Sequence, residues 1–367
     1  YFAAMFAIGL YFSGKNDSTE QYFLGGRNFS GWVVGLSLVG TSISSITFLA
    51  YPGDAFKTNW LRFLPNLMLP IAVIVAAYWF LPKLRRNNSV TAYEFLEARF
   101  GPPIRIYGAV AFMLAQLARI SMILYLISLV LETITGLDAR YCVILSGILV
   151  GAYTIIGGIE AVIWTDVIQT IVLLAGGIVC VVIIVQMIPG GITTIFETAV
   201  AANKFGIGEF SATHAIAPSW GFSLSHKTAT MMLAIGLISW LTEYSSNQNT
   251  VQRFCATRSD AEARKAMFIC ALLSVPTWAF FMFLGTALFV FFETYPAATA
   301  TAIHAGTAKA EEIMPFFIVH NLPQGLGGLV IAAALAAAMS SLDSSMNSIA
   351  TVATHDLYRR FFRPGLA

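Results

Sequence analysis

Long apolar stretches, separated by shorter polar segments, run along almost the whole chain. Most of them are long enough to cross roughly 30 Å of hydrocarbon as a helix. We therefore predict a partial leading span followed by eight membrane-spanning helices and a large loop at residues 189–227. The predicted spans cover residues 1–12, 31–56, 60–81, 104–131, 141–156, 161–188, 228–251, 266–292 and 326–353.

The composition agrees with this pattern. Hydrophobic residues make up 57% of the 367 positions and charged residues only 11%, whereas a soluble domain has about a quarter of its residues charged. The net charge of +2 comes without a basic cluster interleaved with aromatic residues, which argues against a nucleic acid partner. The sequence thus predicts an all-α protein whose surroundings are the lipid bilayer, with no obligate protein partner indicated.

Lysine and arginine residues concentrate in alternate inter-helix segments, such as residues 83–105, 253–265 and 359–363. The positive-inside rule assigns such segments to the cytoplasm. It follows that the chain is expected to be a multi-pass membrane protein with its first end outside and its last end in the cytoplasm.

The first full span contains a polar cluster. Five of the seven residues from Thr41 to Thr47 carry hydroxyl groups, and Gly40 precedes them. Such a cluster is typical of a helix broken at mid-membrane, where freed carbonyl groups coordinate ions or substrate. The alternative is a continuous helix that packs closely against a neighbour through its small residues.

The last span carries a second polar cluster at residues 337–348. Ala337, Ser340, Ser341 and Ser344 follow helical spacing, so their oxygen atoms share one face. Hard cations prefer oxygen ligands, and a singly charged ion such as sodium can be held by hydroxyl and carbonyl groups with few carboxylates. The two polar clusters together therefore indicate a sodium site between the two helices.

Three ionisable residues, Arg119, Asp166 and Asp343, lie within or close to predicted spans. A charge near the bilayer centre costs roughly 3 kcal/mol on insertion scales, so it commonly has a function. Arg119 could bind an acidic ligand or form a structural bridge with an aspartate. Asp166 could also cap its helix near the interface.

Motifs of enzyme chemistry are absent from the sequence, which has no nucleophile elbow, phosphate loop or zinc motif. We do not expect an enzyme. A channel would show polar stripes along several helices, and a membrane sensor on the same fold would not transport. Polar residues concentrated at mid-span favour an occluded binding site instead.

Five segments together give the chain a specific resemblance to the sodium:solute symporter family, and in particular to its bacterial sialic acid branch. The resemblance covers nearly the whole sequence. The segments are residues 22–27 (Tyr-Phe-Leu-Gly-Gly-Arg), 42–47, 157–169, 251–253 (Val-Gln-Arg) and 336–345.

The resemblance implies the inverted-repeat fold of leucine-transporter type, in which two five-helix repeats bind solute and ions at mid-membrane. Residues 1–30 would hold a partial leading helix and a cytoplasmic loop, and residues 31–188 the first repeat. Residues 189–227 would form an extracytoplasmic loop. Residues 228–367 would supply only three helices of the second repeat, which is therefore expected to be incomplete in this chain.

The resemblance also implies a set of site residues. Carbonyl groups of Gly40, Ile43 and Ala337, with hydroxyl groups of Ser340 and Ser341, would bind one sodium ion. Asp166, Ser340 and Ser344 would bind a second, where Asp343 replaces a serine of the sialic acid branch and could bind sodium, a proton or Arg119. The solute cavity would be lined by Ser42, Ser44, Ser45, Thr47, Arg62, Asn66, Arg119, Tyr244, Asn247 and Gln248.

The expected function is sodium-coupled import of a small carboxylate-bearing solute such as a sialic acid, with one or two sodium ions as the coupling ions. The bacterial inner membrane is the expected location. Arg62 and Asn66 depart from the sialic acid pattern, and Asn249 stands where sugar transporters of the family carry a gating tyrosine. A sodium/sugar or sodium/amino-acid symporter therefore remains the alternative.

Overall fold

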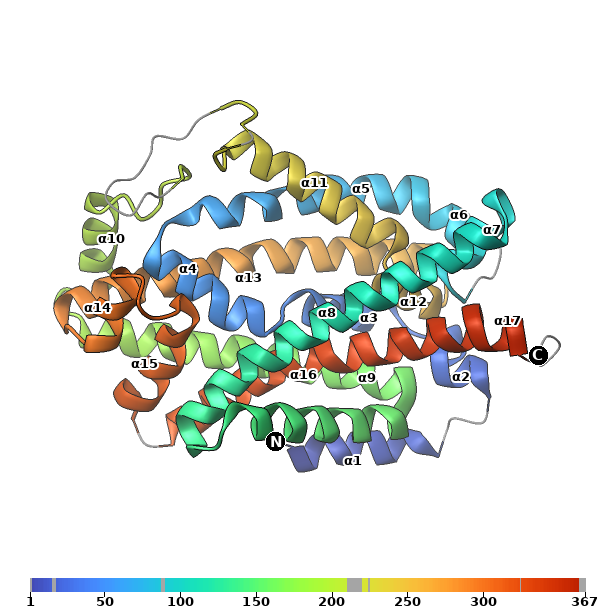
Figure 1. Cartoon of the computed structure of the whole chain (residues 1–367), viewed down its shortest axis with the longest axis horizontal. Coiled ribbons are helices and arrows are strands. Elements are labelled where there is room, and N and C mark those ends of the chain that lie inside the picture. The colour runs from blue at the N-terminus through green and yellow to red at the C-terminus, as the bar shows by residue number, and fades with distance from the viewer. Residues whose placement is uncertain are drawn as a thin grey trace.

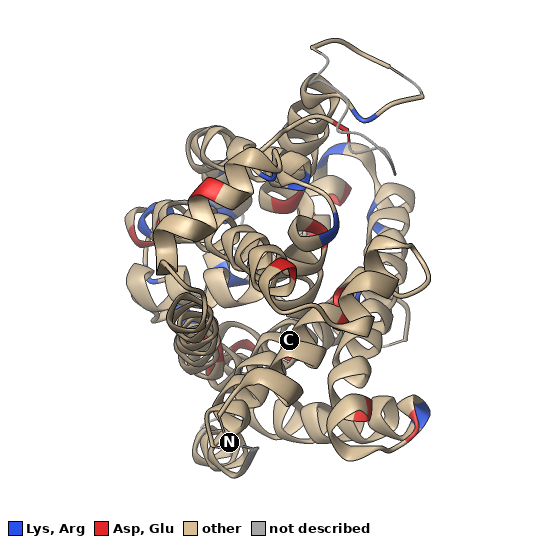
Figure 2. Ribbon diagram, turned by 90° about the vertical axis from the view of Figure 1, so that its left-hand side faces the viewer, with Lys and Arg blue, Asp and Glu red and all other residues tan. Residues whose placement is uncertain are grey.

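A computed structural model describes residues 2–14, 18–86, 90–209, 220–223, 225–323 and 325–362. Helices dominate the described residues, whose one β-type pairing is an isolated bridge between Phe29 and Thr257. The long helices run roughly side by side along the longest axis of the molecule (Figure 1). Most of the ribbon carries no charged residue (Figure 2), as the composition predicts.

The first half of the chain supplies α1 to α9, which include two of the helices at the centre of the bundle, α3 and α9. The short ones are α2 (Thr19–Leu24), α6 (Leu81–Arg86) and α7 (Ala92–Phe100). The others are α1 (Phe2–Ser13), α3 (Gly31–Ser42), α4 (Tyr51–Lys57), α5 (Leu69–Val75), α8 (Pro102–Thr135) and α9 (Ala139–Met187). A 3₁₀ segment, η3 (Trp60–Met68), leads into α5.

The second half supplies two long helices, α13 (Asp260–Thr294) and α16 (Leu326–Val352), and a helix in two pieces, α11 (Ala229–Ser246) and α12 (Gln248–Ala256). The shorter elements are α10 (Gly191–Ala201), α14 (Ala298–His304), α15 (Ile313–Asn321), η6 (Ala353–Tyr358) and α17 (Arg359–Phe362).

Five helices in the described part of the chain are long and apolar enough to cross a membrane, or six if the bent pair Gly31–Ser42 and Ile46–Lys57 forms one span. One of the five, α9, contains Gly158 with φ 61° and ψ −163°. Glycine adopts this conformation because it lacks a Cβ atom, and the ribbon turns back near this point (Figure 1). The predicted spans 141–156 and 161–188 are therefore the two arms of α9.

The predicted loop at residues 189–227 is partly helical. It begins with α10, whose Ile195 and Ala199 are fully buried. The sequence analysis did not predict this helix, which is too short to span a membrane and packs onto α9 and α13. Residues 210–219 and 224 of the same stretch lie outside the described residues.

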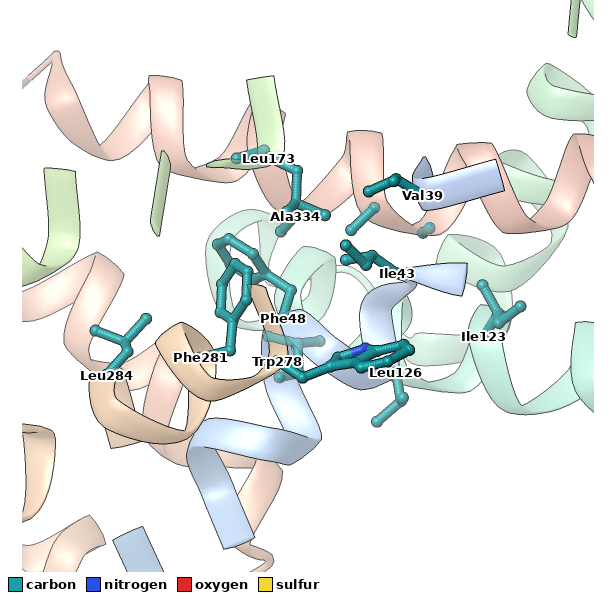
Figure 3. Packing of buried hydrophobic residues seen from close by; sticks show 14 of the residues in the cluster. Val39, Ile43, Phe48, Ile123, Leu126, Leu173, Trp278, Phe281, Leu284 and Ala334 are labelled. Carbon is teal, nitrogen blue, oxygen red and sulfur yellow. The ribbon is translucent and has the colours of Figure 1, made fainter. Parts of the chain in front are cut away.

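The core of the bundle lies where α3, α9, α13 and α16 meet. Val39 and Ile43 on the α3 side face Leu173 and Ala334 across this contact, with Phe48 nearby (Figure 3). All five side chains are buried. Apolar packing thus surrounds the polar segment that follows α3 and limits the routes by which water reaches it.

Candidate functional site

The helix that begins with α3 is broken at its centre. It ends at Ser42, Ile43 is extended at φ −103° and ψ 108°, and a π-helical turn at residues 46–50 leads into α4. The two pieces are bent by 56°. Ser44 Oγ accepts a hydrogen bond from Ile46 N at 3.1 Å, so a side chain replaces a lost helical partner. The predicted break is confirmed, and the continuous-helix alternative is wrong.

Gly40 lets three helices approach one another next to the break. A Cβ atom at this position would lie 2.7 Å from Thr170 Oγ1 and 3.0 Å from Ser340 Oγ. The small cavity beside it is too narrow to hold a water molecule, and it brings together four predicted ion-site residues with four others. Its lining residues are Gly40, Ile43, Gln169, Thr170, Leu173, Ala336, Ala337 and Ser340.

Two hydroxyl groups near this cavity have unused hydrogen-bonding capacity. Ser341 Oγ and Ser45 Oγ are buried and make no hydrogen bond within the described part of the protein. Leaving a buried polar atom without a partner costs about 1–3 kcal/mol, so such atoms commonly serve a ligand. Hydroxyl and carbonyl oxygens with few carboxylates suit a monovalent hard cation, and the residues present therefore fit sodium as a transported ion.

Asp166 occupies the centre of a buried polar cluster beside this cavity. Its Oδ1 accepts a hydrogen bond from Ser340 Oγ at 2.6 Å, and its Oδ2 accepts one from Ser37 Oγ at 2.6 Å. Arg253 Nη2 lies 2.8 Å from the same Oδ2 atom. Asp166 therefore lies inside α9 and is neither a helix cap nor the partner of Arg119.

Arg253 is a site residue that the sequence analysis missed. It was counted with the cytoplasmic segments because the preceding span was predicted to end at residue 251, yet its side chain is only 1% exposed. Arg253 Nη2 also donates to Ser344 Oγ at 2.6 Å. One feature of the sequence could have indicated that Arg253 is buried: it follows a polar stretch within a predicted span, six residues after Asn247.

Asp343 lies on the far side of Ser344 from Arg253. Its Oδ2 accepts a hydrogen bond from Tyr153 Oη at 2.7 Å, and its Oδ1 is 3.3 Å from Ser344 Oγ. Both aspartates thus contact Ser344 or its partners, as the sequence analysis expected, while one guanidinium group supplies a positive charge next to them.

Arg119 contacts the broken helix rather than an aspartate. Its Nη2 donates to the carbonyl oxygen of Thr41 at 2.8 Å, in the last turn of α3. Among the described residues it forms no ion pair, so the bridge to Asp166 or Asp343 is not present in this structure. The guanidinium group retains further donors beside the end of α3.

A second break separates α11 from α12. Asn247 is extended at φ −76° and ψ 118°, and its Oδ1 caps α12 by accepting a hydrogen bond from Asn249 N at 3.0 Å. Just before the break, Tyr244 Oη donates to Cys270 Sγ at 3.1 Å. The predicted span 228–251 is therefore two helices. Ser344 Oγ lies 3.3 Å from Thr41 Oγ1 and accepts a hydrogen bond from Arg253 Nη2 at 2.6 Å, which connects the first break to α12 in one polar centre.

Other predicted solute-binding residues have different surroundings. Gln248 is fully buried, and its side chain binds Val90 O and Ala92 N, both at 2.9 Å. Ser42 Oγ lies 3.9 Å from Cys270 Sγ. Thr47 is buried in the π-helical turn after the first break.

Arg62 and Asn66 lie towards one end of the bundle. Arg62 forms an ion pair with Asp54 and lines a cavity of about 460 Å³ together with Tyr51. Asn66 Nδ2 donates to Tyr51 Oη at 2.9 Å. Both partners, Asp54 and Tyr51, belong to α4, the helix that follows the first break. Among the described residues, the structure records no direct contact of Arg62 or Asn66 with the polar centre.

Two broken helices with polar groups at their breaks define an α-helical secondary transporter. The model of the sodium:solute symporter family matches residues 22–367, and the chain belongs to that family. Sodium is accordingly its coupling ion.

Individual relatives support the assignment. The chain is 36% identical to the sodium/sialic acid symporter SiaT of Proteus mirabilis over 98% of its own length and 70% of the relative. It is 35% identical to the sodium/sialic acid symporter NanT of Aliivibrio fischeri, over 98% of its own length and 68% of that relative.

Solved structures support the fold. A Na⁺-coupled sialic acid symporter in a substrate-bound outward-open state superposes with a TM-score of 0.90 at 34% identity, covering 98% of this chain and 74% of the other. Mhp1, a nucleobase-cation-symport-1 family transporter, superposes with a TM-score of 0.56 at 16% identity, covering 92% and 72%. The predicted all-α, inverted-repeat fold of leucine-transporter type is confirmed.

Proposed function

We propose that this protein imports a carboxylate-bearing solute, a sialic acid, together with sodium across the bacterial inner membrane by alternating access. The observation that carries the solute class is Arg119, a guanidinium group at mid-span that is bound to a backbone carbonyl and forms no ion pair among the described residues. The bacterial relatives whose names include sialic acid support the particular solute.

The chemistry of Arg119 suits this role. A guanidinium group keeps its charge even where water is scarce, and its planar donors match the two oxygens of a carboxylate. The Thr41 carbonyl uses one donor direction and holds the side chain against the break. A solute carboxylate would then bind between Arg119 and the hydroxyl groups of Ser42, Ser44, Ser45 and Thr47.

Sodium would bind at the carbonyl groups of Gly40, Ile43 and Ala337 and the hydroxyl groups of Ser340 and Ser341. These residues join the break of the first helix to α16, so an ion bound there would hold both in one arrangement. The same break would carry the solute, and sodium and solute would favour the same conformation. Reciprocal coupling of their affinities follows.

A second cation position at Asp166, Asp343, Ser340 and Ser344 is part of the proposal. Arg253 Nη2 donates to Asp166 Oδ2 and to Ser344 Oγ, and Ser344 Oγ lies 3.3 Å from Asp343 Oδ1. A cation at the second position would therefore share Asp166 with Arg253, and one sodium ion at the first position is the proposed minimum for coupling. The division into residues 31–188 and 228–367 as the two repeats is proposed on the same grounds.

Uptake by proteoliposomes tests the function. We expect the wild type to accumulate N-acetylneuraminate only with an inward sodium gradient. Arg119→Lys should fold normally and lose affinity for the acid at least tenfold more than for its amide, because a lysine cannot make two parallel hydrogen bonds. An equal loss for both ligands, with reduced stability in their absence, would show that Arg119 is structural and would favour a neutral sugar.

A further inference from the structure

Glu243 lies at the last turn of α11, one helical turn before the second break. Its Oε2 accepts a hydrogen bond from Asn247 Nδ2 at 2.7 Å, and its Oε1 accepts one from Thr250 Oγ1 at 2.8 Å. The Glu243 carboxylate thus connects α11 to Asn247 at the break and to Thr250 in α12. Neither contact neutralises its charge, because both donors are uncharged.

Hydrogen bonds connect the surroundings of Glu243 to α8, the helix that carries Arg119. Asn249 Nδ2 donates to Gln116 Oε1 at 3.1 Å and joins the start of α12 to α8. Arg119 follows Gln116 by three residues and so shares its face of α8. Glu243 Oε1 is bound to Thr250, the residue after Asn249, so these contacts bring the carboxylate to the same region as the Arg119 side chain, where the two charges attract each other.

This arrangement constrains what can bind. A carboxylate group offers about four acceptor positions, of which two are used by Asn247 and Thr250. An acid bound at Arg119 brings its own negative charge towards Glu243, which is unfavourable. A hydroxyl group next to the bound carboxylate would offset that repulsion by donating to Glu243.

We infer that Glu243 is a specificity-determining residue that selects solutes with a hydroxyl group on the carbon bearing the carboxylate. The inference rests on the proposed function, since it requires a carboxylate at Arg119. The ring form of a sialic acid carries such a hydroxyl group. A simple acid without it would meet the Glu243 charge with no compensating hydrogen bond, and the site would reject it.

Matched ligands test this inference on the purified full chain in sodium. N-acetylneuraminate and its 2-deoxy analogue differ by the hydroxyl group in question, and their Kd values are measured by calorimetry. We expect the wild type to bind the 2-deoxy acid at least tenfold more weakly, as a hydrogen bond to a charged acceptor implies. Glu243→Gln keeps the shape of the side chain but removes its charge. In this variant the ratio of the two Kd values, 2-deoxy acid over N-acetylneuraminate, should fall below about threefold.

A matched control is Thr242→Val. Thr242 is a neighbouring exposed residue whose hydroxyl bonds only to Ile238 O in α11, and its substitution should leave the ratio unchanged. If Glu243→Gln does not fold, Glu243→Asp replaces it in the test. This variant keeps the charge but shortens the side chain by one methylene, and it should lower the ratio of the two Kd values.

The outcomes separate the two proposals. A wild type that binds both acids equally, or a Glu243→Gln variant that keeps a tenfold ratio, would overturn the inference and leave the proposed function standing. A wild type that binds neither acid and shows no sodium-driven uptake of N-acetylneuraminate would overturn the proposed function, and the inference with it.

Discussion

Arg253 and Asp166 form a buried ion pair beside the candidate sodium site, with 2.8 Å between Nη2 and Oδ2 and side-chain exposures of 1% and 0%. The pair joins α12, the inner part of the second broken helix, to α9. Removing one member of a buried pair leaves the other charge uncompensated and destabilises a protein by about 3–5 kcal/mol.

We therefore expect Arg253→Gln to lower the unfolding temperature strongly in sodium-free buffer. Sodium should recover part of the loss, because a cation near Asp166 would replace the missing charge. Thermal unfolding in sodium chloride and in choline chloride measures both effects. Arg27→Gln, which breaks a pair at the surface in which the Glu20 side chain is 61% exposed, is the control and should change stability by less than about 1 kcal/mol. Equal destabilisation by the two variants would contradict the assignment.

Ser341 and Ser340 should respond differently to alanine. Ser341 Oγ has no hydrogen-bond partner among the described residues, whereas Ser340 Oγ donates to Asp166 Oδ1. Ser341→Ala is therefore expected to raise the sodium concentration for half-maximal uptake about tenfold while leaving sodium-free stability unchanged. Ser340→Ala should also raise that sodium concentration, and it should in addition lower sodium-free stability. Sodium titrations of uptake and of unfolding temperature distinguish them, and unaltered sodium dependence in both variants would show that the ion binds elsewhere.

Arg105 links three helical elements by ion pairs at one end of the bundle. Its Nε lies 2.6 Å from Asp356 Oδ1 and its Nη1 lies 2.6 Å from Glu97 Oε2, which links α8 to η6 and α7. Arg105→Gln leaves the buried Asp356 carboxylate without a charged partner, so this end should open more often.

Hydrogen exchange of residues 92–100 measures the opening, and we expect it to accelerate at least tenfold, corresponding to about 1.4 kcal/mol. Arg99→Gln is the control, since Arg99 is exposed and forms no ion pair among the described residues. Protection that stays at the wild-type level in Arg105→Gln would exclude a fastening role.

Lys204 provides a test that depends on pH. Its Nζ donates to the carbonyl oxygens of Phe56 at 2.6 Å and Thr58 at 3.0 Å, at the end of α4. Burial lowers the pKa of Lys204 from 10.5 to about 7, although the carboxylate of Glu293 acts in the opposite direction. Below about pH 7 the folded protein holds a buried charge, and between pH 7 and 10.5 the unfolded chain binds one more proton than the folded one.

Stability of the wild type relative to Lys204→Met should therefore rise from pH 6 to pH 9. Unfolding temperatures of the two proteins across this range measure the trend. Lys227→Met, at an exposed position, should show a constant difference from the wild type. A difference that is constant for Lys204→Met as well would mean that this lysine is not buried in solution.

The sequence alone determined the class of protein, the approximate spans and the first broken helix. Hydrocarbon tolerates few charges and few hydroxyl clusters, so the dense polar run at residues 41–47 had a restricted set of explanations. The same reasoning predicts Ser340 and Ser341 as sodium-binding residues, because helical spacing places them on one face of the last span. Local pattern was sufficient wherever the physical constraint was itself local.

The tertiary structure alone decided the partners of the buried charges. Asp166 pairs with Arg253 across 87 residues of sequence, Arg119 with a carbonyl across 78, and Gln248 with the backbone next to α7. No spacing rule relates residues on different helices, so the sequence could state that these side chains need partners but not which ones. Which groups pair depends on how the helices pack. A buried charge is stable only next to a hydrogen-bonding or oppositely charged group, and the packing decides which such group is within reach.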